Sequence, residues 1–135
     1  MSSIEQIPAA MTWHLRQQVM YPDLNLEAVK LPDDEEGIHF GLFDQNRLIS
    51  VISTFQHQEE LQLRKFATLN EFQGRGYGKQ LFEYTLDFAR SKPIKRIWMN
   101  ARTNVSALYE RYGFKKTEQT FFKDGYDFVI MEVYL

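Results

Sequence analysis

Three glycines within five residues, Gly74, Gly76 and Gly78, are the strongest chemical signal in this sequence. They follow an apolar stretch typical of a strand and precede one typical of a helix. Glycine lets several backbone N–H groups converge, and the N-terminal end of a helix adds partial positive charge. Arg75 and Lys79 reinforce that charge. The segment therefore predicts an anion site, for which a phosphate or pyrophosphate is the expected ligand.

The spacing of the glycines excludes two common phosphate-binding motifs. A mononucleotide P-loop requires Gly-x-x-x-x-Gly-Lys-Ser/Thr, which does not occur in the chain. A dinucleotide-binding fingerprint requires Gly-x-Gly-x-x-Gly, and here the third glycine comes one residue too early. Residues 73–78, Gln-Gly-Arg-Gly-Tyr-Gly, instead fit the pattern Gln/Arg-x-x-Gly-x-Gly/Ala. A glycine-rich turn without any ligand is the structural alternative.

A second motif lies about thirty residues further along the chain, where residues 108–114 read Leu-Tyr-Glu-Arg-Tyr-Gly-Phe. The glycine-rich turn and this string, in this order, resemble the two coenzyme-binding motifs of the GNAT superfamily of acyl-CoA-dependent N-acyltransferases. In that superfamily the turn holds the coenzyme A pyrophosphate, and Leu/Phe-Tyr-Glu-Lys-Leu-Gly-Phe closes the coenzyme site. The resemblance covers roughly residues 38–131 and is strongest to small bacterial members with one domain.

The resemblance implies a role for each residue that matches it. On the central strand, the main chain of Phe66, Ala67 and Thr68 would meet the pantetheine arm, and an N–H group there could polarise the thioester carbonyl. Tyr109 matches the tyrosine near the coenzyme sulfur, where a phenol with an ordinary pKa of about 10 could protonate the departing thiolate. Packing in the core is the alternative role of this side chain. The pyrophosphate turn would comprise Gln73, Gly74, Arg75, Gly76, Tyr77, Gly78 and Lys79.

Two positions depart from the pattern of the superfamily. Many relatives have an asparagine seven residues before the tyrosine, where this chain has Arg102, and Asn104 lies two residues further on. Either could contact the cofactor, and Asn104 is a candidate cofactor-binding residue. The carboxylate base of some relatives would fall near Gln62, whose amide cannot accept a proton. The base is therefore unassigned, and its role could pass to a water chain or to Glu59, Glu60, His39 or His57.

The activity implied is transfer of an acetyl group from acetyl-CoA to a primary amine, by direct attack within a ternary complex. A non-catalytic acyl-CoA sensor or an interaction module is the alternative. No metal is expected, because the three histidines have no ligand spacing. The acceptor stays open among small-molecule amines, including amino sugars and antibiotics, peptide N-termini and protein lysines. The acidic loop from Asp33 to Glu36 favours a cationic one.

Composition indicates one globular domain spanning residues 1–135, with 44% hydrophobic residues and no cysteine. The absence of cysteine, of a leader and of an apolar run of membrane length suits a cytoplasmic protein without a membrane partner. Residues 1–60 carry three Lys and Arg against ten Asp and Glu, and residues 61–135 carry thirteen against eight. The basic half suits a polyanionic cofactor. Nucleic acid is an improbable partner, whereas a homodimer is compatible with the sequence.

Periodicity predicts the elements that position these motifs. The expected class is α/β (α+β), and the resemblance implies the GNAT fold, a mixed, mostly antiparallel sheet of about six to seven strands with about four helices. The helix after the glycine turn is expected to turn Leu81, Tyr84 and Phe88 inward, beside Phe82, Thr85 and Ala89. Other helices are predicted over residues 9–20, 24–31 and 103–112. Strands are predicted over residues 4–7, 38–43, 48–55, 61–69, 94–101, 114–122 and 126–135.

Overall fold

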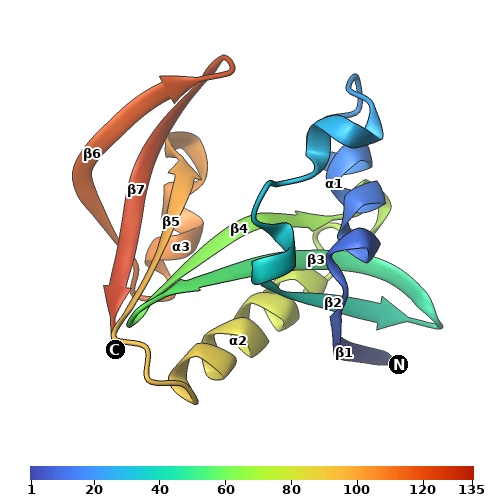
Figure 1. The fold of residues 1–135 in the computed structure, drawn as a ribbon, viewed down its shortest axis with the longest axis horizontal. Coiled ribbons are helices and arrows are strands. Elements are labelled where there is room, and N and C mark those ends of the chain that lie inside the picture. The colour runs from blue at the N-terminus through green and yellow to red at the C-terminus, as the bar shows by residue number, and fades with distance from the viewer.

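The computed structural model describes residues 1–135, which form one seven-stranded sheet in the order β1-β2-β3-β4-β5-β7-β6 (Figure 1). Neighbouring strands are antiparallel except β4 and β5, which run parallel. The predicted mixed and mostly antiparallel sheet is thus confirmed. The strands are β1 (Ser2–Ile7), β2 (Ile38–Asp44), β3 (Arg47–His57), β4 (Glu60–Thr68), β5 (Arg96–Arg102), β6 (Lys115–Lys123) and β7 (Tyr126–Tyr134).

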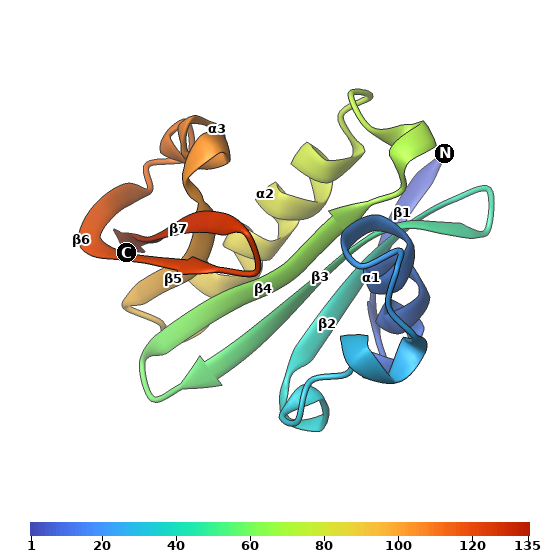
Figure 2. The same cartoon turned by 90° about the horizontal axis from the view of Figure 1, so that it is seen from above.

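Three α-helices accompany the sheet: α1 (Trp13–Met20), α2 (Tyr77–Arg90) and α3 (Ser106–Glu110). Helices α1 and α2 lie on opposite faces of β2–β4 (Figure 2). None of the helices combines the length and the apolar character that a membrane span requires. Five short 3-10 turns complete the structure: η1 (Ala9–Thr12), η2 (Leu26–Val29), η3 (Asp34–Glu36), η4 (Asn70–Phe72) and η5 (Thr103–Val105).

The helix count is lower than predicted, because the segment 24–31 forms only the turn η2. The Asn25 side chain caps this turn by accepting a hydrogen bond from the Ala28 N–H (3.1 Å). Asparagine side chains compete with the backbone in this way, and they favour caps and turns over longer helices. The apolar residues of this segment are thus compatible with a helix, but the segment is too short for their spacing to establish one.

Helix α2 buries one face against the sheet, as its periodicity predicts, but the buried set differs from the predicted one. Tyr84 was predicted to face inward and is 42% exposed, with its ring set edge-on against that of Phe40 at 5.3 Å between centroids. Leu86 is buried in its place. Tyrosine keeps its hydroxyl in water while its ring covers apolar surface, which explains this boundary position. The buried residues of α2 are Leu81, Phe82, Thr85, Leu86 and Ala89.

The sheet divides between its two parallel strands. Strands β4 and β5 pair only over residues 60–62 and 96–98, and the β1–β4 half then diverges from the β5–β7 half (Figure 1). Strand β4 also contains a bulge beyond the residues that pair with β5. At this bulge Lys65 takes a left-handed conformation (φ 54°), and the register with β3 shifts between Val51 and Ser53. A bulge bends its strand and increases the local twist. This divergence positions the candidate site.

Candidate functional site

A cavity of about 700 Å³ lies where β4 and β5 separate. Its walls come from residues 63–68 of β4 and residues 99–102 of β5, together with the end of α1, the glycine-rich turn and α3. Of the residues predicted from the sequence to bind the coenzyme or act on it, nine line this cavity: Phe66, Ala67, Thr68, Gln73, Gly74, Gly76, Gly78, Lys79 and Tyr109. The fold thus brings the two sequence motifs together in one space.

The glycine-rich turn forms the N-terminal end of α2. Gly74 and Gly76 have φ values of 79° and 87°, the left-handed region that favours glycine, and Gly76 is the residue that precedes the helix. The first helical hydrogen bond runs from the Gln80 N–H to the Gly76 carbonyl (3.0 Å). The N–H groups of Tyr77, Gly78 and Lys79 therefore have no acceptor within the helix. Together with the helix dipole they make this end suitable for an anion.

Gly78 serves close packing rather than a special backbone angle. A Cβ atom at this position would lie 3.3 Å from the Phe66 Cζ atom and 3.3 Å from the Thr68 hydroxyl oxygen. Both of those contacts come from β4, so the absence of a side chain lets the first turn of α2 approach the strand. The third glycine of the motif thus sets the width of the cavity between the strand and the helix.

One edge of β4 is open along the cavity. Beyond Gln62 the strand has a partner only on its β3 side, where Ala67 pairs with Val51 and Thr68 with Ser50. Backbone N–H and C=O groups on the other side have no strand to pair with, although they require partners when they are shielded from water. This edge can therefore form strand-like hydrogen bonds with an extended ligand that enters between β4 and β5.

Tyr109 lies on α3 and is half-buried among aromatic rings. Its ring centroid is 5.5 Å from that of Phe82 and 6.4 Å from that of Phe114, so the ring is fixed by packing. Burial raises the pKa of its phenol above the ordinary value of 10.0. The hydroxyl forms no hydrogen bond within the protein, and it is accessible to solvent. A protonated phenol is thus held at the cavity wall, where it can donate a proton.

Three residues that were predicted to bind the cofactor do not line the cavity. The Tyr77 hydroxyl donates to the Asp44 carboxylate (2.8 Å). The Arg75 guanidinium packs over the ring of Phe72, 5.4 Å from its centroid. Asn104 is exposed in the turn η5, whereas the alternative, Arg102, lines the cavity from β5. The side chains of these three residues are directed away from the cavity, unlike those of their neighbours that line it. The spacing of the glycines does not predict the direction of a side chain.

None of the residues considered as a general base lines the cavity. His39 is buried, and its ring nitrogens contact the Ser53 hydroxyl (2.7 Å) and the Asp34 carbonyl (2.8 Å). His57, Glu59 and Glu60 are exposed around the β3–β4 turn, where the two glutamates pair with Lys95 and Arg96. No three His, Asp or Glu side chains come close enough together to hold a metal ion. No side chain is therefore assigned as the general base.

Several cavity residues were not proposed as site residues from the sequence. Met20 contributes from the end of α1, Tyr112 from the segment after α3 and Phe128 from β7. Arg64 and Lys65 contribute from β4, and both precede Phe66, the first residue of this strand to which the resemblance gives a role. Their only signal in the sequence is their position just before Phe66 on the central strand, since the bulge that directs them is not encoded by a local motif.

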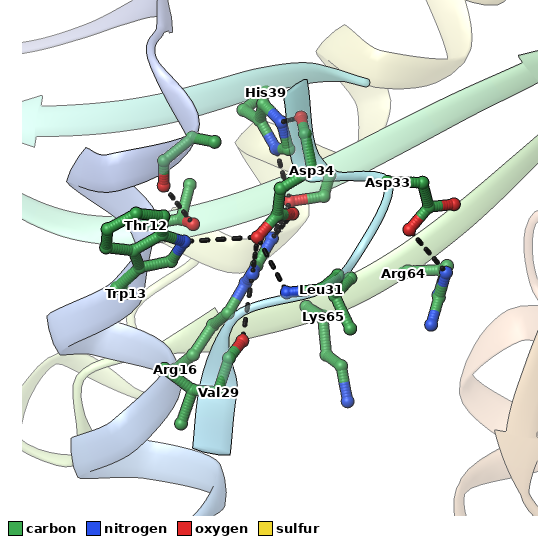
Figure 3. Close-up of polar contacts among 12 residues, drawn as sticks. Thr12, Trp13, Arg16, Val29, Leu31, Asp33, Asp34, His39, Arg64 and Lys65 are labelled. Atoms are coloured by element: carbon green, nitrogen blue, oxygen red, sulfur yellow. Dashed lines mark hydrogen bonds and ion pairs between the residues drawn. The ribbon is translucent and has the colours of Figure 1, made fainter. Parts of the chain in front are cut away.

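A buried polar network holds α1 and the loop after it against the sheet (Figure 3). Arg16 is fully buried, and its guanidinium contacts both carboxylate oxygens of Asp34, at 2.8 and 2.9 Å. Burial raises the pKa of Asp34, but hydrogen bonds from Arg16, the Leu31 N–H and Trp13 outweigh it and hold that pKa below the ordinary value of 3.8. The Asp34 carboxylate therefore has a structural role.

The expectation that the acidic loop attracts a cationic acceptor is not supported by the positions of its side chains. None of the residues 33–36 lines the large cavity. Asp34 is buried with Arg16, and the Asp33 carboxylate lies 3.5 Å from the Arg64 guanidinium. Glu35 and Glu36 are exposed to solvent. Two of the four charges are thus compensated within the protein.

A family model described as an acetyltransferase (GNAT) domain matches residues 13–135. YitI of Bacillus subtilis, an uncharacterized N-acetyltransferase, is 25% identical over 130 residues, which cover 90% of this chain and 87% of that protein. The ribosomal protein bS18-alanine N-acetyltransferase of Haemophilus influenzae is 27% identical over 123 residues, covering 87% of this chain and 84% of that protein.

Solved structures share the fold. The crystal structure of a candidate N-acetyltransferase from Lactobacillus plantarum superposes with a TM-score of 0.88 at 19% sequence identity. The superposition covers 99% of this chain and 98% of the other. At this identity the likeness concerns the fold alone.

Proposed function

Because the chain belongs to the GNAT acetyltransferase family, it is an acyltransferase that uses acetyl-CoA, and we propose that it transfers the acetyl group directly to a primary amine in a ternary complex. The observation that carries this proposal is the composition of one cavity wall. The open edge of β4, the free N–H groups at the start of α2 and the Tyr109 phenol all border the same space. Each has a different task in acetyl transfer.

Binding of the coenzyme would use the first two of these groups. The N-terminal end of α2, with its glycines and Lys79, would hold the pyrophosphate. The unpaired edge of β4 at Phe66, Ala67 and Thr68 would form hydrogen bonds with the amide groups of the pantetheine arm. The thioester when bound supplies an activated acetyl group. These contacts would fix its carbonyl against the strand, so that reaction requires little further ordering.

The reaction would then depend on charge stabilisation and one proton donor. A neutral amine attacks the carbonyl carbon, and an N–H group of β4 stabilises the negative charge that develops on the oxygen. Tyr109 donates its proton to the departing sulfur and then regains one from water; the raised pKa of the phenol ensures that it carries this proton at neutral pH. The amine loses its proton to water, since no carboxylate or histidine lines the cavity.

Calorimetry with acetyl-CoA tests the coenzyme site. Wild-type protein is expected to bind acetyl-CoA, and Gly76→Glu is expected to abolish binding, because the substitution places a negative charge in the turn and a side chain at φ 87°. Gly125→Glu, at φ 85° in the β6–β7 turn, is the matched control and should bind normally. A folded wild-type protein that fails to bind acetyl-CoA would refute the proposal.

Release of free thiol in the presence of an amine panel tests catalysis. Tyr109→Phe keeps the packing against Phe82 but removes the proton donor, so kcat should fall by roughly 100-fold while the Kd for acetyl-CoA is unchanged. Binding of acetyl-CoA without thiol release from any amine would favour a non-catalytic acyl-CoA sensor instead. Full activity of Tyr109→Phe would leave that ring a packing role only.

A further inference from the structure

Three basic side chains line the cavity in addition to Lys79, which belongs to the glycine-rich turn. Arg64 and Lys65 come from the bulged part of β4, and Arg102 comes from β5. Lys65 extends toward the end of α1, where its ammonium group donates to the Tyr21 hydroxyl and lies 4.7 Å from the centre of that ring. Helix α1 is on the opposite face of the sheet from α2 (Figure 2). The Lys65 charge is therefore separate from the turn at the start of α2.

The same cavity has no compensating negative side chain. Neither aspartate nor glutamate is found among its lining residues. Lys65 and Arg102 form no ion pair in the protein, and the Arg102 guanidinium instead packs on the ring of Tyr126, 3.8 Å from its centroid. Arg64 has one partner, Asp33, at 3.5 Å. Figure 3 shows Arg64 and Lys65 beside the loop that carries Asp33 and Asp34. The net charge of the side chains that line the cavity is thus positive.

A cationic environment of this kind disfavours a polyamine or another multiply charged cation, since like charges repel in a partly enclosed space. It favours an acceptor that carries an anionic group in addition to the amine. Such a group would bind the basic side chains, and the amine would remain free to reach the thioester. The neighbouring cations would also lower the pKa of the bound amine, which increases the fraction present as the reactive neutral form.

We propose that the acceptor is a small primary amine that carries a carboxylate, and that Lys65 is its principal anchor, with Arg64 and Arg102 alongside. This proposal rests on the acetyltransferase activity proposed above and specifies its substrate class. Lys65 is chosen as the anchor because it lies at the bulge itself, next to Phe66, the first of the three residues whose N–H groups could polarise the thioester. The α1 face would thereby supply the acceptor site and the α2 face the coenzyme site.

Matched acceptors test the proposal most directly. The probes are 4-aminobutyrate and 5-aminopentanoate, each compared with its own carboxamide, and spermidine as a cationic amine. In these ω-amino acids the amine is distant from the acid group, so its pKa changes little between acid and amide. Thiol release at saturating acetyl-CoA gives kcat/KM for each. Wild-type protein is expected to prefer each acid over its amide by at least tenfold, and over spermidine by more.

Variants connect that preference to Lys65. Lys65→Met keeps the side-chain length and the same backbone conformation but removes the charge, so the acid-to-amide ratio should fall roughly 10- to 100-fold, as expected for a lost hydrogen bond to a charged group. Lys65→Arg should retain most of the ratio. Lys92→Met, which removes an exposed lysine near the end of α2, is the matched control and should leave the ratio unchanged.

The outcomes separate this proposal from the one it rests on. Preference for the amides or for spermidine, or an unchanged ratio in Lys65→Met, would overturn the acceptor class while the enzyme assignment stands. An increase in the Kd for acetyl-CoA in Lys65→Met without a change in the ratio would place Lys65 in the coenzyme site and would also overturn it. If wild-type protein binds no acetyl-CoA, the enzyme assignment fails and the acceptor proposal fails with it.

Discussion

Replacing Arg16 with methionine should unfold the protein at a markedly lower temperature, although Arg16 lies outside the candidate site. The guanidinium is fully buried and makes hydrogen bonds to Asp34, to the Val29 carbonyl (3.1 Å) and to the Ser53 hydroxyl (2.8 Å). Methionine fills a similar space but donates no hydrogen bond. The variant therefore leaves the Asp34 carboxylate buried without its cation, on the loop that connects α1 to β2.

The expected loss is large because only one partner is removed. Breaking a buried ion pair in this way costs about 3–5 kcal/mol. With an unfolding entropy of about 2.1 cal/mol/K per residue, each kcal/mol lowers the Tm of a domain of this size by roughly 3–4 °C. We therefore expect Tm to fall by about 10–18 °C and the denaturant midpoint to fall in parallel. Arg90→Met removes an exposed arginine paired with Asp87 and should change stability by less than about 0.5 kcal/mol.

The pH dependence gives the sharper test. In the wild type the pKa of Asp34 is held below 3.8, so its stabilising contribution is present above that value and is lost only as pH falls through the folded pKa. In Arg16→Met burial dominates and raises the folded pKa above the unfolded one. Asp34 then gains a proton on mild acidification, and the destabilisation should shrink between pH 7 and pH 4.5. A loss under 1 kcal/mol, or one independent of pH in this range, would refute the reasoning.

Two further predictions concern the coenzyme side of the cavity. Since burial raises the pKa of the Tyr109 phenol above 10.0, ionisation of this group should cause little decline of kcat up to about pH 9, as followed by thiol release; a decline well below pH 9 that is absent in Tyr109→Phe would contradict this role. Gly78→Val should weaken acetyl-CoA binding at least tenfold in calorimetry, because even its Cβ would lie 3.3 Å from Phe66 and Thr68, while an unchanged Kd would show that the width between β4 and α2 is not critical.

The parts of the fold that depend on local sequence could be predicted. Alternating apolar residues gave the strands, and Gly74 and Gly76 have the positive φ values that only a glycine-rich turn accommodates easily. Each of these features depends on a few consecutive residues. The resemblance of the two motifs to those of the GNAT superfamily also predicted that residues near 76 and 109 share one site, because both motifs bind the coenzyme in that superfamily. The cavity that both border is consistent with that prediction.

Features that depend on distant residues could not be predicted. The Arg16–Asp34 pair joins residues 18 positions apart, and neither residue type signals a buried partner, since both are usually exposed. Likewise, the bulge at Lys65 arises from the register between β3 and β4, and it is the bulge that turns this side chain to the end of α1. Without it, strand alternation assigns Lys65 to the same face as the buried Leu63 two residues earlier.

Charge illustrates why a total along the sequence is a poor guide to a site. The acidic balance of residues 1–60 suggests attraction of a cation, yet a charge acts on a ligand only according to its distance and its shielding. Asp34 is enclosed with Arg16, and Asp33 is compensated by Arg64. The charges that do border the cavity are Arg64, Lys65, Lys79 and Arg102, all positive. The charges that border the site are thus positive, whereas residues 1–60, which were expected to attract a cationic acceptor, carry a net negative charge.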